Sequence, residues 1–561
     1  MSTNLNLCRI PETGRDILLD LSMASRHGLV TGATGTGKTV TLQALAEGFS
    51  RAGVPVLCCD VKGDLSGLAA AGGANSKIAA AFGKLGLPEP AWLANPAAFW
   101  DVSGERGHPL RATVSDLGPL LLGRLLGLGD VQADTLRLLF RIADERDLPV
   151  LDLADLRALV EWATTNAAAL KAEYGLMSSS SLGAIQRSIL VLEDTGAGRF
   201  FGEPALDIDD LIRVGADGRG VVNVLASEDL MAEPALYATV LLHLLGELFE
   251  ELPEAGDLAK PKLILLLDEA HLLFDDAPKA LVDAVERTAR LVRSKGVGLW
   301  LVTQSPLDVP ESVLGQLGNR IHHALRAYTP RDRKAVDSIA QTLRPNPKVD
   351  AAVVITELGV GEALVSFLDA DGRPTPVERV RVVPPASRIG ALLPAERASL
   401  VAASPLGVRY AKVVDRQSAY EILKGKMNGS ARPGADARAG SEPASRPGTD
   451  AGAREPTIEE IEAELRGITL PDRAEYGEPR FSDEPDIGGE PAARPAARTN
   501  ARAAESRSAT TRSAASRSRA PVEVSAGGFA AELARVALSA AGRELGRQAV
   551  RSILGTRWRR R

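Results

Sequence analysis

The sequence is poor in aromatic residues and cysteine, and it has no long apolar run. Aromatic residues make up 4% of 561 residues, and only three cysteines occur. Cys8, Cys58 and Cys59 lack metal-binding spacing, and two are adjacent on a predicted buried strand, so we expect no disulfide framework. The purest aliphatic run ends at Asp268, far short of the roughly 18–20 residues that span a bilayer. Because a signal pattern is also missing, we expect a cytoplasmic protein without stable membrane insertion.

Charge of neither sign dominates the composition. The net charge is -6, with 45% hydrophobic and 25% charged residues, as in soluble globular proteins. Nucleic acid would therefore have to bind through a local basic surface that the total charge conceals. A chain of 561 residues is too long for one ordinary domain, so we expect a large core with appendages.

Short apolar strands alternate with helical patterns in the first part of the chain and again from residue 221. A strand at 27–31 leads into a glycine-rich loop, a helix follows at 40–50, and a second buried strand lies at 54–59. This order is the βαβ unit of a parallel sheet. Further buried strands are predicted at 221–224, 263–267, 299–303 and 321–327. The fold class is therefore α/β with a mostly parallel sheet.

The spacing of apolar residues divides the chain into six parts. The predicted core is 1–90 and 221–390, which closes with a β-hairpin at 362–383 and is interrupted by a mostly helical insertion at 91–220. A helical extension follows at 391–428. Residues 429–528 are rich in Ala, Arg, Ser and Pro, so we expect a disordered linker. Residues 529–561 regain helical spacing, which predicts an amphipathic helix for docking or oligomerisation, with a nucleic-acid or membrane-surface contact as the alternative.

The loop after the first buried strand matches G-x-x-x-x-G-K-[ST] in full. Its glycines let backbone N–H groups turn inward around phosphate oxygens, and the helix N-terminus adds its positive end. Lys38 would reach the β- and γ-phosphates, and the Thr39 hydroxyl would bind Mg²⁺. A glycine-rich turn is the alternative, and the flanking strand and helix argue against it. The expected nucleotide-binding residues are Gly32, Ala33, Thr34, Gly35, Thr36, Gly37, Lys38, Thr39 and Val40.

Two acids, Asp268 and Glu269, directly follow the aliphatic strand 263–267. A carboxylate at the end of a buried strand beside the loop can hold the Mg²⁺ shell, which we assign to Asp268. The adjacent Glu269 can act as the base that polarises the attacking water. Two acids that merely open a turn are the alternative. The second acid separates the pattern from small-molecule kinases and GTPases, and the guanine-reading [NT]-K-x-D is missing, which favours ATP.

Other polar residues near strand ends are weaker candidates. Gln304 ends the strand 299–303 and would sense the γ-phosphate or orient the water, unless it is an ordinary strand-to-loop amide. An arginine should neutralise charge on the transferred phosphoryl group, and Arg290, Arg293 and Arg320 flank this strand, although each is equally compatible with a surface salt bridge.

The segment after the second buried strand carries two further acids. Asp60 and Asp64 would make second-shell magnesium or substrate contacts, or form a simple turn. We interpret His271, His322 and His323 as structural, since no ligand-spaced partner accompanies them.

This order of motifs resembles the HerA-like branch of the HerA–FtsK superfamily of hexameric DNA-pumping ATPases, and more narrowly a bacterial group of HerA-helicase-like C-terminal-domain proteins. The segments that carry the resemblance are 27–39, 60–64, 267–271, 302–306, 319–321 and 359–383. The resemblance covers about residues 1–427 and the last thirty or so. It implies a RecA-like core, a ring assembly, and ATP-driven movement on double-stranded DNA or another polymer. HerA proteins carry a β-barrel before the P-loop, and here about 30 residues precede Gly32, so HerA's DNA-end-processing partnership is not carried over.

The resemblance also bears on the arginines. In FtsK-type members, an arginine three residues before the glycine that precedes the sensor strand acts across the subunit interface. The matching position is Arg293, before Gly296, and we prefer it to Arg320. The leading hypothesis is thus an ATP-hydrolysing helicase or translocase. The alternatives are a nucleotide-switched scaffold that recruits partners through its tail and last helix, and a motor that acts on protein.

Overall fold

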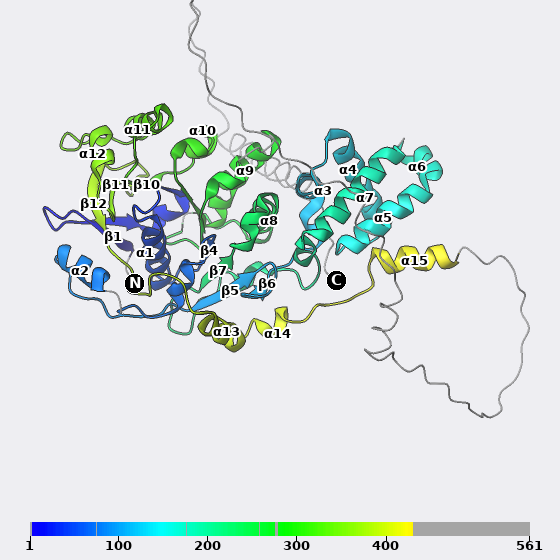
Figure 1. The fold of residues 1–561 in the computed structure, drawn as a ribbon, viewed down its shortest axis with the longest axis horizontal. Coiled ribbons are helices and arrows are strands. Elements are labelled where there is room, and N and C mark those ends of the chain that lie inside the picture. The colour runs from blue at the N-terminus through cyan, green and yellow to red at the C-terminus, as the bar shows by residue number, and fades with distance from the viewer. Residues whose placement is uncertain (1–2, 74–75, 176, 257, 275–278, 430–561) are drawn as a thin grey trace, which may run out of the picture. The chain divides into compact units, whose positions relative to one another are not determined.

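The computed structural model describes residues 3–73, 76–175, 177–256, 258–274 and 279–429. These residues form a twelve-stranded mixed sheet with the strand order β2-β1-β12-β11-β10-β3-β9-β8-β4-β7-β5-β6, and helices pack against it (Figure 1). The predicted linker beyond residue 429 and the predicted helix at 529–561 lie outside the described residues. None of the helices in this part of the chain has the length and apolarity needed to cross a bilayer.

Eight neighbouring strands of the sheet run parallel. In sheet order they are β10 (Asn319–His323), β3 (Gly28–Thr31), β9 (Val297–Thr303), β8 (Leu263–Leu267), β4 (Val56–Asp60), β7 (Val222–Ala226), β5 (Ala97–Asp101) and β6 (His108–Pro109). Most are short and fully buried, as expected for strands covered on both faces. Because the carboxyl ends of parallel strands share one edge, the segments that follow β3, β9, β8 and β4 emerge side by side. This confirms the predicted α/β class with a mostly parallel sheet.

Four antiparallel strands extend the sheet beyond β10. They are β11 (Glu362–Ser366), β12 (Glu378–Val382), β1 (Asn4–Arg9) and β2 (Asp16–Asp20). The pairing of β11 with β12 confirms the predicted hairpin. The hairpin of β1 and β2 was missed by sequence reasoning, although Leu5 and Leu7 of β1 are buried between more exposed asparagines, which is the alternation of a strand with one face on the core.

Residues that alternate along each central strand pack on opposite faces of the sheet. Ile264 and Leu266 of β8 share a core with Phe49 of α1 (Lys38–Arg51). Their neighbours Leu265 and Leu267 face the other core, together with α8 (Pro234–Glu251) and α9 (Lys279–Val292). The sheet is therefore the middle layer of three, and the two cores hold its strand ends in fixed register.

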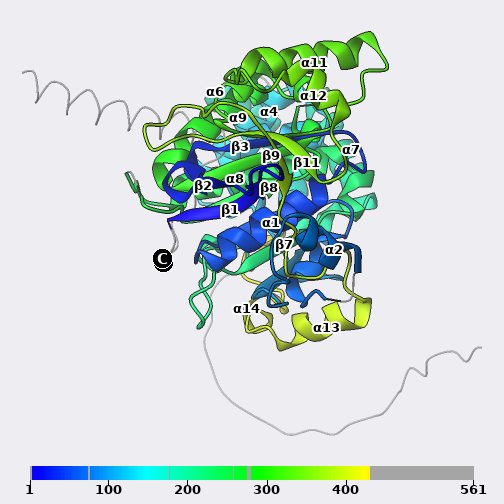
Figure 2. The same cartoon turned by 90° about the vertical axis from the view of Figure 1, so that its left-hand side faces the viewer.

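The remaining helices form three groups. Near the antiparallel strands and β10 lie α2 (Ser76–Lys84), α10 (Glu311–Leu314), α11 (Pro330–Thr342) and α12 (Ala351–Glu357). The insertion contains α3 (Val114–Leu125), α4 (Asp130–Glu145), α5 (Leu153–Thr165), α6 (Ala167–Tyr174) and α7 (Ser179–Asp194). The C-terminal extension contains α13 (Pro394–Ala403), α14 (Gly407–Tyr410) and α15 (Ala419–Gly429). Helices α11 and α12 lie on the opposite side of the strands from α13 and α14 (Figures 1 and 2).

The insertion differs from its predicted boundaries in one respect. Strands β5 and β6 lie inside the range 91–220 but belong to the main sheet, so the helical part begins at α3. A five-residue, mostly apolar run such as β5 has no periodicity that distinguishes a strand from a buried helical turn.

The C-terminal extension contacts the helices of the insertion, where the backbone N–H of Tyr420 donates to Asp155 of α5 at 2.8 Å. Figure 1 shows α3 to α7 gathered beyond β6.

Candidate nucleotide site

Three adjacent strands deliver the candidate residues to one edge of the sheet. Strand β9 lies between β3 and β8, with Thr303 paired to Thr31 and Leu301 paired to Leu267. The glycine-rich loop, Gln304 and the Asp268–Glu269 pair therefore begin at neighbouring strand ends. Strand β4 lies on the far side of β8 and adds the segment from Asp60 to Asp64.

The glycine-rich loop has a backbone that requires glycine at two points. Gly32 has φ 153° and Gly37 has φ 118°, and a Cβ on Gly32 would lie 2.5 Å from the Cβ of His323. The Ala33 N–H donates to the carbonyl of Ala324 at 2.9 Å. These constraints hold the loop against the end of β10, with its N–H groups leading into the first turn of α1.

His323 lies against the glycine-rich loop and is a neutral imidazole. Its Nδ1 lies 2.8 Å from the carbonyl oxygen of Glu362 and its Nε2 lies 2.8 Å from the hydroxyl of Thr41 on α1. A carbonyl can only accept, so Nδ1 carries the proton and Nε2 accepts from the hydroxyl. Burial lowers the pKa of His323 to about 4, which keeps the ring neutral at physiological pH.

Lys38 points back into the loop that it follows. Its Nζ donates to the carbonyl oxygens of Gly32 at 2.5 Å and Ala33 at 3.1 Å. Burial and the nearby Lys62 ammonium lower the pKa of Lys38. A buried ammonium enclosed by a glycine loop at a helix N-terminus forms an anion site of the phosphate-binding kind.

The Asp268–Glu269 pair is buried and conformationally strained. Glu269 adopts a left-handed backbone with φ 48°, which costs a non-glycine residue about 1 kcal/mol. The buried Tyr237 hydroxyl donates to the Asp268 carbonyl at 2.8 Å and helps hold the turn. Burial raises the pKa of Asp268, and the Lys62 charge partly offsets this. Oε2 of Glu269 accepts no hydrogen bond from the described residues and lies 3.4 Å from Nδ1 of His271.

Lys62 bridges the segment after β4 to both acids. Its Nζ lies 3.0 Å from Oε1 of Glu269 and 3.7 Å from Oδ2 of Asp268. Burial alone would lower the pKa of Lys62, but the two carboxylates outweigh it and raise the pKa. The cation therefore fixes the orientation of the Glu269 carboxylate from the neighbouring strand.

Asp60 and Asp64 differ in what they contact. The Asp64 carboxylate accepts a hydrogen bond from the hydroxyl of Thr39, and burial raises its pKa. Asp60 accepts the N–H of Leu65 at 3.0 Å, within its own turn. Burial and the nearby carboxylates of Asp64 and Glu228 raise the pKa of Asp60 to about 7. Asp64 thus lies beside the expected metal-binding hydroxyl, whereas Asp60 stabilises the turn.

The donors at this edge fit Mg²⁺. The Thr39 hydroxyl and the Asp268 carboxylate are hard oxygen ligands, and Mg²⁺ in nucleotide sites takes one or two protein oxygens beside water and phosphate. Within the described ranges, no group of three or more His, Cys, Asp or Glu residues forms a protein cage for a metal. A metal shared with a nucleotide suits this donor set.

Gln304 and the candidate arginines occupy different edges. Gln304 is exposed directly after Thr303, at the edge that carries the loop. Arg293 begins a short 3-10 helix (Arg293–Lys295) that precedes β9, so it lies at the opposite edge. Arg320 pairs with Leu29 in the first half of β10, and its Nη1 donates to the Thr342 hydroxyl at 2.9 Å. Neither arginine lies beside Lys38 of its own chain, so a role for either stays a prediction.

Comparison with known proteins places the chain in a family. Residues 6–471 match the helicase HerA-like C-terminal family. The chain belongs to this family. The HerA-like chain is 31% identical to the DNA double-strand break repair helicase HerA of Sulfolobus acidocaldarius over 149 residues, which is 26% of this chain and 29% of the relative. It is 32% identical to HerA of Saccharolobus solfataricus over 104 residues, or 18% and 20% of the two chains. The matched regions thus span less than a third of these curated relatives.

Solved structures are more distant. Plasmid coupling protein TrwB with ADP and Mg²⁺ is 16% identical, with a TM-score of 0.45, and the match covers 68% of this chain and 89% of TrwB. VirB4 of Thermoanaerobacter pseudethanolicus is 14% identical, with a TM-score of 0.44 and coverage of 71% and 99%.

Four residues of this HerA-like site were not assigned a site contact from sequence. Lys62 and Tyr237 were not singled out, and His271 and His323 were interpreted as structural. His271 lies next to the acid pair, and this proximity in the chain was the one available signal for its contact with Glu269. The other contacts depend on which strands are neighbours, which the sequence does not state.

Proposed function

We propose that this chain binds Mg·ATP, hydrolyses it, and uses the energy to move double-stranded DNA as a cytoplasmic homo-oligomeric ring, most simply a hexamer. The observation that carries the proposal is that Lys38, Asp268 and Glu269 follow neighbouring strands at one edge of a parallel sheet, close enough for the charges of both acids to act on the lysine. Membership in the helicase HerA-like family supports the class of reaction. The second acid distinguishes the site from kinases and GTPases and favours ATP.

Each residue has a role that its geometry suits. The N–H groups of the glycine loop and the Lys38 ammonium bind the phosphates, and Thr39 and Asp268 would hold Mg²⁺, which supplies positive charge to the phosphate oxygens. Glu269 accepts the proton of the attacking water; its buried Oε2 accepts no hydrogen bond from the described residues and lies 3.4 Å from Nδ1 of His271. Gln304 senses whether the γ-phosphate is present, at the start of the loop that follows β9.

In a ring of subunits, an arginine at the opposite edge of the sheet can complete the nucleotide site of the neighbouring subunit. In a head-to-tail ring, one edge of each subunit faces a different edge of the next. Arg293 precedes β9 and is suited to complete the neighbour's site, with Arg320 as the second choice. A fork from the next subunit would neutralise charge on the transferred phosphoryl group and tie hydrolysis to assembly. We also propose that the C-terminal helix at 529–561 recruits a protein partner.

The experiment that tests the proposal compares wild-type protein with Glu269→Gln and Lys38→Ala. We expect Glu269→Gln to bind ATP and assemble, yet to hydrolyse it about 100-fold more slowly, because the base is lost. Lys38→Ala should lose nucleotide binding itself. Glu161→Gln, an exposed acid on α5, is the matched control and should behave as wild type. Normal turnover by Glu269→Gln would overturn the assignment of the base.

A further inference from the structure

One surface segment concentrates positive charge in a chain that is net negative. Residues 326–334, here called the basic segment, link β10 to α11 and include the first turn of that helix. The segment carries four exposed cations and one exposed aromatic ring. They are Arg326, Arg331, Arg333, Lys334 and Tyr328, whose ring is 80% exposed. Of the large apolar and aromatic side chains that are exposed in the described residues, Tyr328 is the one aromatic.

Most of this charge is not neutralised within the chain. The side chains of Arg326, Arg333 and Lys334 make no hydrogen bond or ion pair with other described residues. The carboxylate in the segment, Asp332, accepts the N–H groups of Tyr328 at 3.1 Å and Thr329 at 2.9 Å, which caps α11. Cations in the first turn of a helix also oppose the helix dipole. The arrangement stabilises neither the helix nor a salt-bridge network, which indicates an external anion.

We propose that the basic segment is the surface through which this chain contacts the phosphate backbone of DNA; this rests on the proposed function. Guanidinium and ammonium groups without internal partners bind phosphate by releasing counterions. An exposed tyrosine supplies a hydroxyl for the same backbone or a ring for an unstacked base. An unfolded polypeptide would need an apolar binding surface, and Tyr328 is the one large apolar or aromatic side chain that the segment exposes.

Two contacts join the basic segment to the nucleotide site. Ala324, two residues before Arg326, accepts the N–H of Ala33 from the phosphate loop at 2.9 Å. Arg331 pairs with Asp308 at 3.1 Å, and Asp308 accepts the hydroxyl of Thr303, the last residue of β9, at 3.1 Å. The end of β9 is therefore linked to Arg331 of the basic segment through Asp308, and the phosphate loop contacts the chain two residues before the segment begins.

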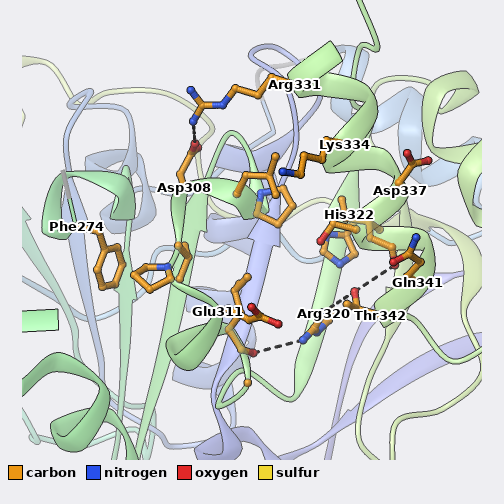
Figure 3. A pocket seen from close by; sticks show the side chains of 18 residues that line it. Phe274, Asp308, Glu311, Arg320, His322, Arg331, Lys334, Asp337, Gln341 and Thr342 are labelled. Atoms are coloured by element: carbon orange, nitrogen blue, oxygen red, sulfur yellow. Dashed lines mark hydrogen bonds and ion pairs between the residues drawn. The ribbon is translucent and has the colours of Figure 1, made fainter. Parts of the chain in front are cut away.

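Figure 3 shows the second of these contacts at the rim of a cavity of about 980 Å³. Arg331 and Lys334 line the cavity from α11, and Asp308 lines it from the loop after β9. The first turn of α11 thus faces open space rather than packed core. The ion pair between Arg331 and Asp308 joins α11 to the loop after β9 at this rim.

The test uses the full chain and measures DNA binding as a function of salt. The variant combines Arg326→Ala, Arg333→Ala and Lys334→Ala, all exposed, so the fold should be kept. A control of equal charge combines Lys171→Ala, Arg187→Ala and Lys412→Ala, which are exposed elsewhere. The probes are a 30-base-pair duplex, the corresponding single strand, and poly-glutamate.

We expect the segment variant to bind duplex at least about tenfold more weakly, with a salt slope shallower by about 2 to 3, since each phosphate contact contributes about 0.9. ATP hydrolysis without DNA should stay at the wild-type rate, and the control should match wild type throughout. Unchanged duplex affinity and slope in the segment variant would overturn this inference alone. Wild-type protein that hydrolyses ATP but binds no DNA would overturn the proposed function as well. Loss of poly-glutamate binding with intact duplex binding would assign the segment to an acidic protein and overturn the DNA contact.

Discussion

Lys62 and Glu269 form an ion pair across neighbouring strands, with Nζ 3.0 Å from Oε1. The lysine follows β4 and the glutamate follows β8, so the pair forms because these strands are adjacent in the sheet. It holds one oxygen of the proposed base and leaves Oε2 without a hydrogen bond from the described residues. The pair thus fixes one oxygen of the proposed base, while the other oxygen is buried 3.4 Å from Nδ1 of His271.

Replacement of Lys62 should affect turnover more than binding. We expect Lys62→Ala to lower kcat about 10- to 100-fold, since a misplaced base loses alignment with the water, while the KM for ATP changes by less than about threefold. Lys62→Arg should recover part of the rate, because the guanidinium can reach the same carboxylate. Lys84→Ala, an exposed lysine on α2, is the control. A change in KM alone would show that Lys62 binds nucleotide and does not position Glu269.

The strained backbone of Glu269 predicts an unusual order of stabilities. Glu269→Gly and Glu269→Ala both remove the carboxylate and its pairing with Lys62, and both should be inactive. Glycine adopts φ 48° without strain because it has no Cβ, whereas alanine does not. The glycine variant should therefore be more stable than the alanine variant by about 1 kcal/mol. Urea unfolding of the two variants measures this difference. Equal stability, or a more stable alanine variant, would show that the turn stores no strain.

Loss of the Tyr237 hydroxyl should destabilise the turn that carries the acids. Tyr237→Phe leaves the buried Asp268 carbonyl without its donor, which costs about 1–3 kcal/mol. Tyr328→Phe makes the same chemical change at an exposed ring and should cost less than about 0.5 kcal/mol. Thermal unfolding of both variants at one pH measures the difference. Identical midpoints would show that the Tyr237 hydroxyl does not hold the turn.

Buried histidines predict a loss of stability in mild acid. Burial lowers the pKa of His27, His243 and His323 to about 4 and of His322 to about 3, so below pH 6.5 the unfolded chain binds more protons than the folded chain. At pH 5.5 each of these four histidines then costs about 1.3 kcal/mol relative to neutral pH, or about 5 kcal/mol together. Asp60 acts in the opposite direction, because its pKa is raised to about 7 and its protonation favours the folded state.

Protonation of Asp60 should stabilise the folded chain by about 2 kcal/mol between pH 7.5 and 5.5, so the histidines dominate and the net loss of stability is about 3 kcal/mol. Unfolding free energies at the two pH values test the sign. Asp60→Asn removes the opposing contribution, so its loss on acidification should exceed that of wild type by about 2 kcal/mol. A wild-type protein that is equally stable or more stable at pH 5.5 would contradict the assignment of neutral, buried histidines.

The sequence predicted what is local and missed what depends on strand order. The glycine loop and the Asp268–Glu269 pair are contiguous motifs with their own backbone requirements, so they were recognisable without the fold. The contact of Lys62 with Glu269 requires β4 beside β8, and the support of the loop by His323 requires β10 beside β3. Neither adjacency follows from the order of strands along the chain.

The same limit explains the errors in the boundaries. Strand β5 was assigned to the helical insertion because its five residues carry no period of their own. Strands β1 and β2 were missed because β1 joins the sheet by pairing with β12, with Cys8 opposite Val382 more than 350 residues later in the chain, and β2 pairs only with β1.

The steady-state rate of ATP hydrolysis with and without linear double-stranded DNA tests the central claim most directly, together with the particle mass in the presence of ATP. The account predicts a rate that rises several-fold with duplex DNA, in a particle whose mass is a multiple of 59.1 kDa. The rise should be absent in Glu269→Gln, which retains assembly. An identical rate with and without DNA, in a protein that remains a monomer, would contradict the account of a DNA-moving ring.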